Sequence, residues 1–153
     1  MQNAGYGISR RLLALWLTAM VSLIMVGCAA MKQSETVDGK SLVGTNWQVE
    51  SVDSGGIIDN SMITVSFPEQ GRIAGSTGCN RYMGNFVVGS GGAVTVSGMG
   101  STRRACPEAL MNQEGKVLAA LEATTQVKME GSQFLLLLDA VGKQRLKMIA
   151  VEP

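Results

Sequence analysis

A glycine-rich stretch with one cysteine places the tightest constraint on how this chain can fold. Residues 75–86 contain three glycines, Cys79 and several polar turn formers between two strand-like segments. So many residues that permit unusual backbone angles predict a forced conformation rather than a loose loop. The expected partner of this stretch is the segment 102–107, which carries Cys106. We therefore expect the two cysteine-bearing segments to meet in the folded protein.

The N-terminal residues have the pattern of a bacterial export signal. Arg10 and Arg11 precede an apolar run over residues 12–26, which is followed by Gly27 and Cys28. This run of about 15 residues is shorter than the roughly 20 that a membrane-spanning helix needs. Residues 24–28 resemble the lipobox of bacterial lipoproteins, in which cleavage leaves an acylated cysteine as the N-terminus. An uncleaved anchor and a secretory signal with a chance cysteine are the alternatives to lipidation of Cys28.

The lipobox resemblance also implies a location. Acyl chains such as palmitate on Cys28 would hold the protein on a bilayer, because each buried methylene contributes about 0.8 kcal/mol. Ala29 and Ala30 follow Cys28, without the aspartate that retains enteric lipoproteins in the inner membrane. We therefore expect an outer-membrane lipoprotein that faces the periplasm.

The remaining sequence divides into a polar tether and one domain. Residues 28–41 are mostly polar and show no periodicity, which is typical of a flexible linker. With residues 1–27 as the signal peptide, the domain is expected over residues 42–153. Its length of about 110 residues lies within the usual range for a single domain.

The absence of one residue type excludes several kinds of chemistry. The sequence contains no histidine, so Ser-His-Asp catalysis, Cys-His catalysis and imidazole metal sites are ruled out. We expect no enzyme activity, no metal and no cofactor. After loss of Arg10 and Arg11, 11 basic residues remain against 12 acidic ones, and no basic cluster indicates nucleic-acid binding. The expected partners are the membrane, through the lipid anchor, and an envelope protein or lipid.

The periodicity of the domain favours strands, with one helix. Nineteen glycines, three prolines and 46% apolar residues are typical of a turn-rich β protein. A helix is expected from about Pro107 to Ala123, because proline suits the first turn and an apolar stripe follows at helical spacing. That stripe consists of Leu110, Met111, Val117, Leu118 and Leu121. Strand patterns occur at residues 44–52, 62–67, 72–75, 85–88, 93–96, 126–130, 133–139 and 145–151.

Two alternatives remain for the leucine-rich strand at residues 133–139. It is either buried on both faces or has a second face that meets another protein, and the first reading is favoured. The helix is expected to cover the open side of the sheet.

The two cysteine segments resemble the META domain of HslJ-like, heat-inducible bacterial lipoproteins. The match covers about residues 42–151, and Trp47 and the leucine-rich strand also fit it. The resemblance implies a curved antiparallel sheet or incomplete barrel of about seven or eight strands, with one helix packed across it and no established catalytic activity. Heat induction and altered novobiocin resistance are further implications. The residues that carry it are Gly78, Cys79, Asn80, Arg81, Tyr82, Gly84, Thr102, Ala105, Cys106, Met111, Glu114 and Leu121.

Cys79 and Cys106 could form a disulfide, a reactive thiol pair or two buried thiols. An oxidising periplasm favours the disulfide, which would close a loop of about 27 residues. Cys106 directly precedes the expected helix, where a thiolate is stabilised, so a redox role is the second reading. Asn80, Arg81 and Tyr82 are candidate binding residues, although Asn80 can act as a turn former and Tyr82 as a packing residue.

Two functions follow from the sequence. The first is a non-enzymatic envelope lipoprotein that binds another envelope component and contributes to stress or novobiocin tolerance. The second is a small carrier that holds a lipid or other apolar ligand on the concave face of the sheet. The two differ in whether the inner face of the sheet is filled by the chain's own side chains.

Overall fold

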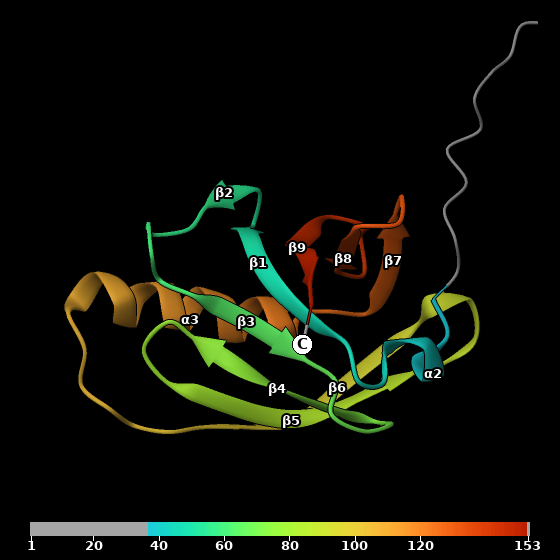
Figure 1. Cartoon of the computed structure of the whole chain (residues 1–153), viewed down its shortest axis with the longest axis horizontal. Coiled ribbons are helices and arrows are strands. Elements are labelled where there is room, and N and C mark those ends of the chain that lie inside the picture. Colours follow the sequence, from blue (N-terminus) through green and yellow to red (C-terminus); the bar gives the residue numbers. More distant parts are fainter. Residues whose placement is uncertain (1–36, 153) are drawn as a thin grey trace, which may run out of the picture. The chain divides into compact units, whose positions relative to one another are not determined.

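Alternating apolar and polar residues build a curled antiparallel sheet in the computed structural model, which describes residues 37–152 (Figure 1). The alternation is clearest in β3, where Ile63 and Val65 point into the core while Thr64 and Ser66 point outward. The strands are β1 Asn46–Val52, β2 Gly55–Gly56, β3 Ile63–Ser66, β4 Arg72–Thr77, β5 Arg81–Val88, β6 Val94–Ser101, β7 Gln126–Glu130, β8 Phe134–Leu138 and β9 Gln144–Val151, with a short 3-10 turn, η1, at Ser90–Gly92.

The first and last strands of the domain lie side by side in the middle of the sheet. The nine-stranded sheet has the order β6-β5-β4-β3-β1-β9-β8-β7, and β2 pairs with β1 alone. Its two edges meet at one end, where Ala93 forms a bridge with Gln126 and the Val94 N–H donates to the Thr125 carbonyl at 2.8 Å. This arrangement confirms the predicted curved antiparallel sheet, or incomplete barrel, with one main helix.

The main helix, α3 Glu108–Glu122, packs against β1, β4, β6 and β9. It begins directly after Pro107, as predicted, and Glu108 lies in its first turn, where the helix dipole favours a negative charge. The predicted apolar stripe is only partly correct. Met111 is 40% exposed, whereas the carboxylate-bearing Glu114 is buried.

The inner face of the sheet is filled by the chain's own side chains. This core is the feature that separates the two functions expected from the sequence, because a carrier needs an open inner face. In the leucine-rich β8, Leu135, Leu137 and Leu138 are buried and Leu136 is half-buried. The largest fully buried apolar side chains are Val49, Ile63, Val65, Ile73, Val117, Leu121, Val127, Leu135, Leu137, Leu146 and Met148.

The structured region begins earlier than the expected boundary at residue 42. Val37 and Leu42 are both buried in the core, and Leu42 is the last residue of the one-turn helix α2 Gly39–Leu42. Asp38 caps this turn by accepting a hydrogen bond from the Lys40 N–H at 3.2 Å. Residues 37–41 therefore belong to the domain rather than to a tether, because two apolar side chains anchor an otherwise polar tract.

The glycine-rich stretch is mostly strand, although residues 76–84 were left between the predicted strands. Strands β4 and β5 occupy all of it except residues 78–80, and β6 continues beyond the predicted end at residue 96. Gly75 lies beneath the Tyr82 hydroxyl, and a β-carbon there would be 2.7 Å from that oxygen. Gly84 leaves room for the Met99 sulfur in the same way. These two glycines permit close approach within a sheet. Gly75 was predicted as a strand residue, whereas Gly84 was left between two predicted strands.

Candidate functional site

The turn at residues 78–80 is held by covalent and steric constraints. Gly78 has a φ of 90°, which favours glycine, and a β-carbon at this position would collide with the Ser61 carbonyl. Both the backbone angle and the lack of space therefore require glycine here. Cys79 forms a disulfide with Cys106, with the two Cα atoms 6.1 Å apart. The structure thus has the disulfide favoured from the sequence. It joins the β4–β5 turn to the segment that leads into α3.

Asn80 is the hub of a buried hydrogen-bond network. Its side chain is only 2% exposed. The Oδ1 atom accepts hydrogen bonds from the Arg104 N–H and the Thr102 hydroxyl, each at 2.8 Å. The Nδ2 atom donates to the Glu114 carboxylate at 2.9 Å. Asn80 was a candidate binding residue, and the structure places it inside the protein, where it connects the turn to the segment before α3 and to the helix itself.

Glu114 supplies the charged end of this network. Its side chain is 7% exposed, and its Oε2 atom lies within hydrogen-bond distance of both Asn80 Nδ2 and the Thr77 hydroxyl, the latter at 3.0 Å. The sequence resemblance included Glu114 but assigned it no role. The sequence did contain a signal that Glu114 is buried. Glu114 lies three residues before Val117 and seven before Leu121, on the apolar face of the helix. A carboxylate on that face needs partners inside the protein.

Tyr82 is also buried, and it supports the sheet. Its hydroxyl donates to the Thr64 carbonyl at 3.0 Å across Gly75, and burial raises the pKa of the phenol well above its ordinary value of 10.0. Tyr82 was a second candidate binding residue. Its hydroxyl is directed into the sheet instead.

We expect Tyr82→Phe to lower the free energy of unfolding by about 1 kcal/mol at neutral pH, because one buried hydrogen bond is lost. In the wild-type protein, the phenol of Tyr82 also makes the free energy of unfolding depend on pH. Its unfolded chain loses the phenol proton near pH 10, while the folded protein retains it, so this stability is present below pH 10.0 and declines above it. Urea unfolding across this range should show a steeper alkaline decline for the wild type than for the variant. Equal declines would contradict the assignment.

Arg81 differs from its two neighbours because it faces outward. Its side chain is exposed and lines a shallow hollow of about 340 Å³ on the face of the sheet that points away from α3. Three strands, β3, β4 and β5, contribute to this hollow, through Thr64, Ser66, Ala74, Gly75, Ser76, Arg81, Tyr82 and Met83. Of the three candidate binding residues, Arg81 alone presents its functional group at the surface.

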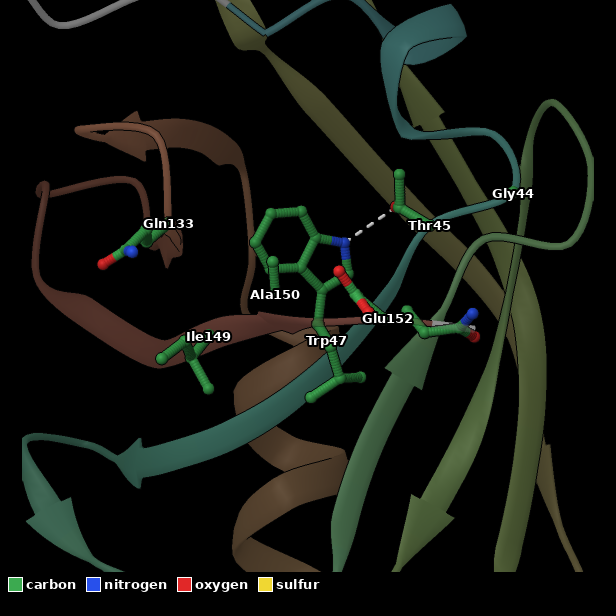
Figure 2. Close-up of a pocket in the computed structure, with 9 residues that line it drawn as sticks. Gly44, Thr45, Trp47, Gln133, Ile149, Ala150 and Glu152 are labelled. Carbon is green, nitrogen blue, oxygen red and sulfur yellow. Dashed lines mark hydrogen bonds between the residues drawn. The ribbon is translucent and has the colours of Figure 1, made fainter.

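A larger, more apolar pocket of about 530 Å³ lies beside Trp47, where β1 begins and β9 ends (Figure 2). The indole is only 4% exposed, and its Nε1–H donates to the Thr45 hydroxyl at 2.8 Å. Gln133 and Glu152 bring the polar groups that Figure 2 shows around the indole. The rest of the wall combines the aliphatic side chains of Ile149, Ala150 and Val151 with Gly44, Thr45 and Asn46.

Cys28, the predicted lipidation site, lies outside the described residues, as do the signal peptide and most of the expected tether. Within residues 37–152, no helix is long and apolar enough to cross a membrane. The same residues contain no cluster of three or more acidic or cysteine side chains that could hold a metal ion.

Comparisons with known proteins identify the domain and its fold. The family model described as META domain matches residues 40–152. A protein from Burkholderia xenovorans, solved by NMR, is 24% identical with a TM-score of 0.63, covering 78% of this chain and 90% of that one. A second NMR structure is 28% identical with a TM-score of 0.60, covering 74% and 94%. A DUF4847 family protein from Bacteroides vulgatus shares the fold at 13% identity and a TM-score of 0.53, covering 72% and 94%. No match was found among the curated proteins.

Proposed function

We propose that this chain, which belongs to the META domain family, is a non-enzymatic lipoprotein of the bacterial outer membrane that binds another envelope component. One observation carries the proposal. The buried groups of Asn80, Tyr82 and Glu114 are hydrogen-bonded within the protein, whereas Arg81, in the same segment, is exposed beside a hollow. The buried residues form a support, and the exposed face of the sheet is the binding surface.

The same network argues against catalysis at this site. A general acid or base must come within hydrogen-bond reach of a substrate. Glu114 is the buried carboxylate of the site, and it lies beneath the turn with Asn80 and Thr77 on its Oε2 atom. The two cysteines are joined in a disulfide, so neither is a free nucleophile in this structure.

The carrier function is not proposed, because the feature on which it depended is absent from residues 37–152. The inner face of the sheet is occupied by buried side chains and covered by α3. An apolar ligand there would have to displace the core. The exposed outer face remains as the surface for an envelope partner.

The physiological role that we propose follows the family resemblance: tolerance of envelope stress, including exposure to novobiocin. The lipobox at Cys28 supports an anchored protein, because acyl chains hold a protein on a bilayer through their buried methylenes. Anchoring would keep the domain where envelope partners are concentrated.

In a strain that lacks the gene, we expect the wild-type protein to restore novobiocin tolerance and to fractionate with the outer membrane. Cys28→Ser should do neither, because the acyl anchor is lost and only weak membrane contacts remain. Fractionation, intact mass and growth in graded novobiocin measure these outcomes together.

The matched control is Ala29→Asp, which keeps the acylated cysteine and introduces the residue that retains enteric lipoproteins in the inner membrane. This variant should remain membrane-bound but move to the inner membrane. An unchanged mass and location of Cys28→Ser would contradict lipidation. Full novobiocin tolerance without anchoring would contradict the proposed role at the membrane.

A further inference from the structure

Three hydrogen-bond donors lie in one row across the outer face of the sheet. Thr64 of β3 pairs directly with Ser76 of β4, and Ser76 pairs directly with Arg81 of β5. Directly opposed residues on neighbouring strands point to the same face, and the strands are about 4.8 Å apart. The row therefore brings two hydroxyls and a guanidinium together along one wall of the hollow.

Both hydroxyls of this row accept a hydrogen bond from a backbone N–H. Thr64 Oγ1 accepts a hydrogen bond from the Ser76 N–H at 3.1 Å, and Ser76 Oγ accepts one from the Gly78 N–H at 3.1 Å. Neither hydroxyl donates to another group within residues 37–152. A hydroxyl whose lone pair is engaged by an N–H retains its proton for an incoming acceptor. The row thus offers protons to a ligand that brings acceptor atoms.

The guanidinium of Arg81 has no ion-pair partner among the described residues. The same holds for Arg103 and Arg104, which follow Thr102, whose N–H donates to the Arg81 carbonyl at 2.9 Å. All three arginines are exposed. Positive charge is therefore concentrated at this end of the sheet, although residues 28–153 carry slightly more acidic than basic residues.

A second row beside the donors is less polar. Ser66 pairs with Ala74, and Ala74 pairs with Met83, which is 59% exposed. The Ser66 hydroxyl is already engaged, because it donates to the Ala74 carbonyl at 3.0 Å. Ala74 and Met83 thus give the hollow an apolar side next to its row of donors, and methionine adapts readily to the shape of a ligand.

We propose that the hollow over β3, β4 and β5 binds the phosphate group of a phosphate monoester, with the ligand's apolar part against Ala74 and Met83. Phosphate brings several strong acceptor oxygens, and the planar fork of arginine matches its geometry. The inference rests on the proposed binding role of this face and specifies the chemistry of the ligand. Phosphorylated lipid headgroups and free phosphate share this chemistry.

The support beneath the row reduces the cost of binding. Arg81 directly follows Asn80, which is fixed by the buried network, and the disulfide fixes the turn. Arg81, Ser76 and Thr64 also lie on paired strands, so their backbone is ordered before the ligand arrives. Preorganised donors lose less entropy on binding than donors on a mobile loop.

The test is a calorimetric titration of the full-length protein, purified with its N-terminal segment and held in phosphatidylcholine nanodiscs. The probes are inorganic phosphate and dihexanoyl phosphatidic acid. Dihexanoyl phosphatidylcholine is the control, because it has the same acyl chains but a zwitterionic phosphodiester in place of the phosphate monoester. We expect Arg81→Gln to weaken binding of the phosphate probes about tenfold to a hundredfold, as for loss of a charge-assisted hydrogen bond. Arg72→Gln is the matched control, because Arg72 lies on the same face of β4 but already pairs with Glu69 and Asn85.

The outcomes are distinct. Binding of both phosphate probes supports a site for the phosphate group itself, and binding of the phosphatidic acid alone supports a lipid ligand. No binding of either probe overturns the proposal, as does equal weakening by Arg72→Gln, which would indicate charge alone. Equal binding of the phosphatidylcholine also overturns it. Failure here would leave the membrane and novobiocin results untouched, so the broader proposed function is judged separately.

Discussion

Asn80→Ala should lower the free energy of unfolding by about 3 to 5 kcal/mol, one of the two largest effects that we expect in this protein. The substitution removes one small amide but leaves several groups without partners. The Arg104 N–H and the Thr102 hydroxyl lose the Oδ1 acceptor, and the Glu114 carboxylate loses a donor. Glu114 is buried, so the loss of its donor costs more than the roughly 1 to 3 kcal/mol of a neutral buried group, whereas Thr102 and Arg104 are exposed residues whose freed groups can bond to water.

Urea unfolding, with the midpoint and slope measured for both proteins, checks this prediction. Asn112→Ala is the matched control, because Asn112 is an exposed asparagine on α3. It should change stability by less than about 0.5 kcal/mol. A loss below about 1 kcal/mol for Asn80→Ala would mean that the network is satisfied by other groups or by water, and that Asn80 is not its hub.

Replacing both Cys79 and Cys106 by alanine should cost about 2 to 4 kcal/mol, the second large effect. The two residues are 27 positions apart, and an open chain of that length gains considerable conformational entropy when it unfolds. The substitution should lower stability without changing the fold, because neither cysteine belongs to the buried apolar cluster that the strands and α3 form. Circular dichroism of the variant should therefore match that of the wild type.

Reduction of the wild-type protein provides an internal check on this prediction. Dithiothreitol should lower the stability of the wild type to nearly that of the double-alanine variant and leave the variant unchanged. Thiol titration of the unfolded, unreduced protein should find no free thiol from Cys79 or Cys106. Two titrating thiols in protein isolated from the periplasmic face would contradict a structural disulfide.

Much of the fold was predictable because the strands carry their own periodicity. In β3, the apolar residues Ile63 and Val65 alternate with Thr64 and Ser66, and the structure buries the first pair as predicted. The helix was predictable for a similar reason, since Pro107 marks its start. Both signals are local, so a single sequence contains them.

The extent of β4, β5 and β6 was not predictable, because it depends on contacts between segments distant in the sequence. Gly75 is needed where Tyr82 crosses the sheet, and Gly84 where Met99 packs. A single sequence shows each glycine but not the side chain that fills its space. Gly84 was therefore left between the predicted strands, as a glycine in a turn would be.

The candidate site was predictable in its location but not in its division of roles. Asn80, Arg81 and Tyr82 all lie where the sequence indicated, yet only Arg81 faces outward. The alternation of side chains along a strand explains Arg81 and Tyr82, because consecutive residues point to opposite faces. The burial of Asn80 depends on Glu114, which lies 34 residues further along the chain.

The central claim is that the polar residues beneath the turn act as one support, with Asn80 and Glu114 as its energetic centre. A double-mutant cycle over Asn80→Ala and Glu114→Ala tests this most directly, with the free energy of unfolding measured for all four proteins. We predict that the double variant loses at least about 1.5 kcal/mol less than the sum of the single losses, because each substitution removes the partner of the other side chain. Additive losses, to within about 0.5 kcal/mol, would show that the two side chains do not depend on each other and would contradict the claim.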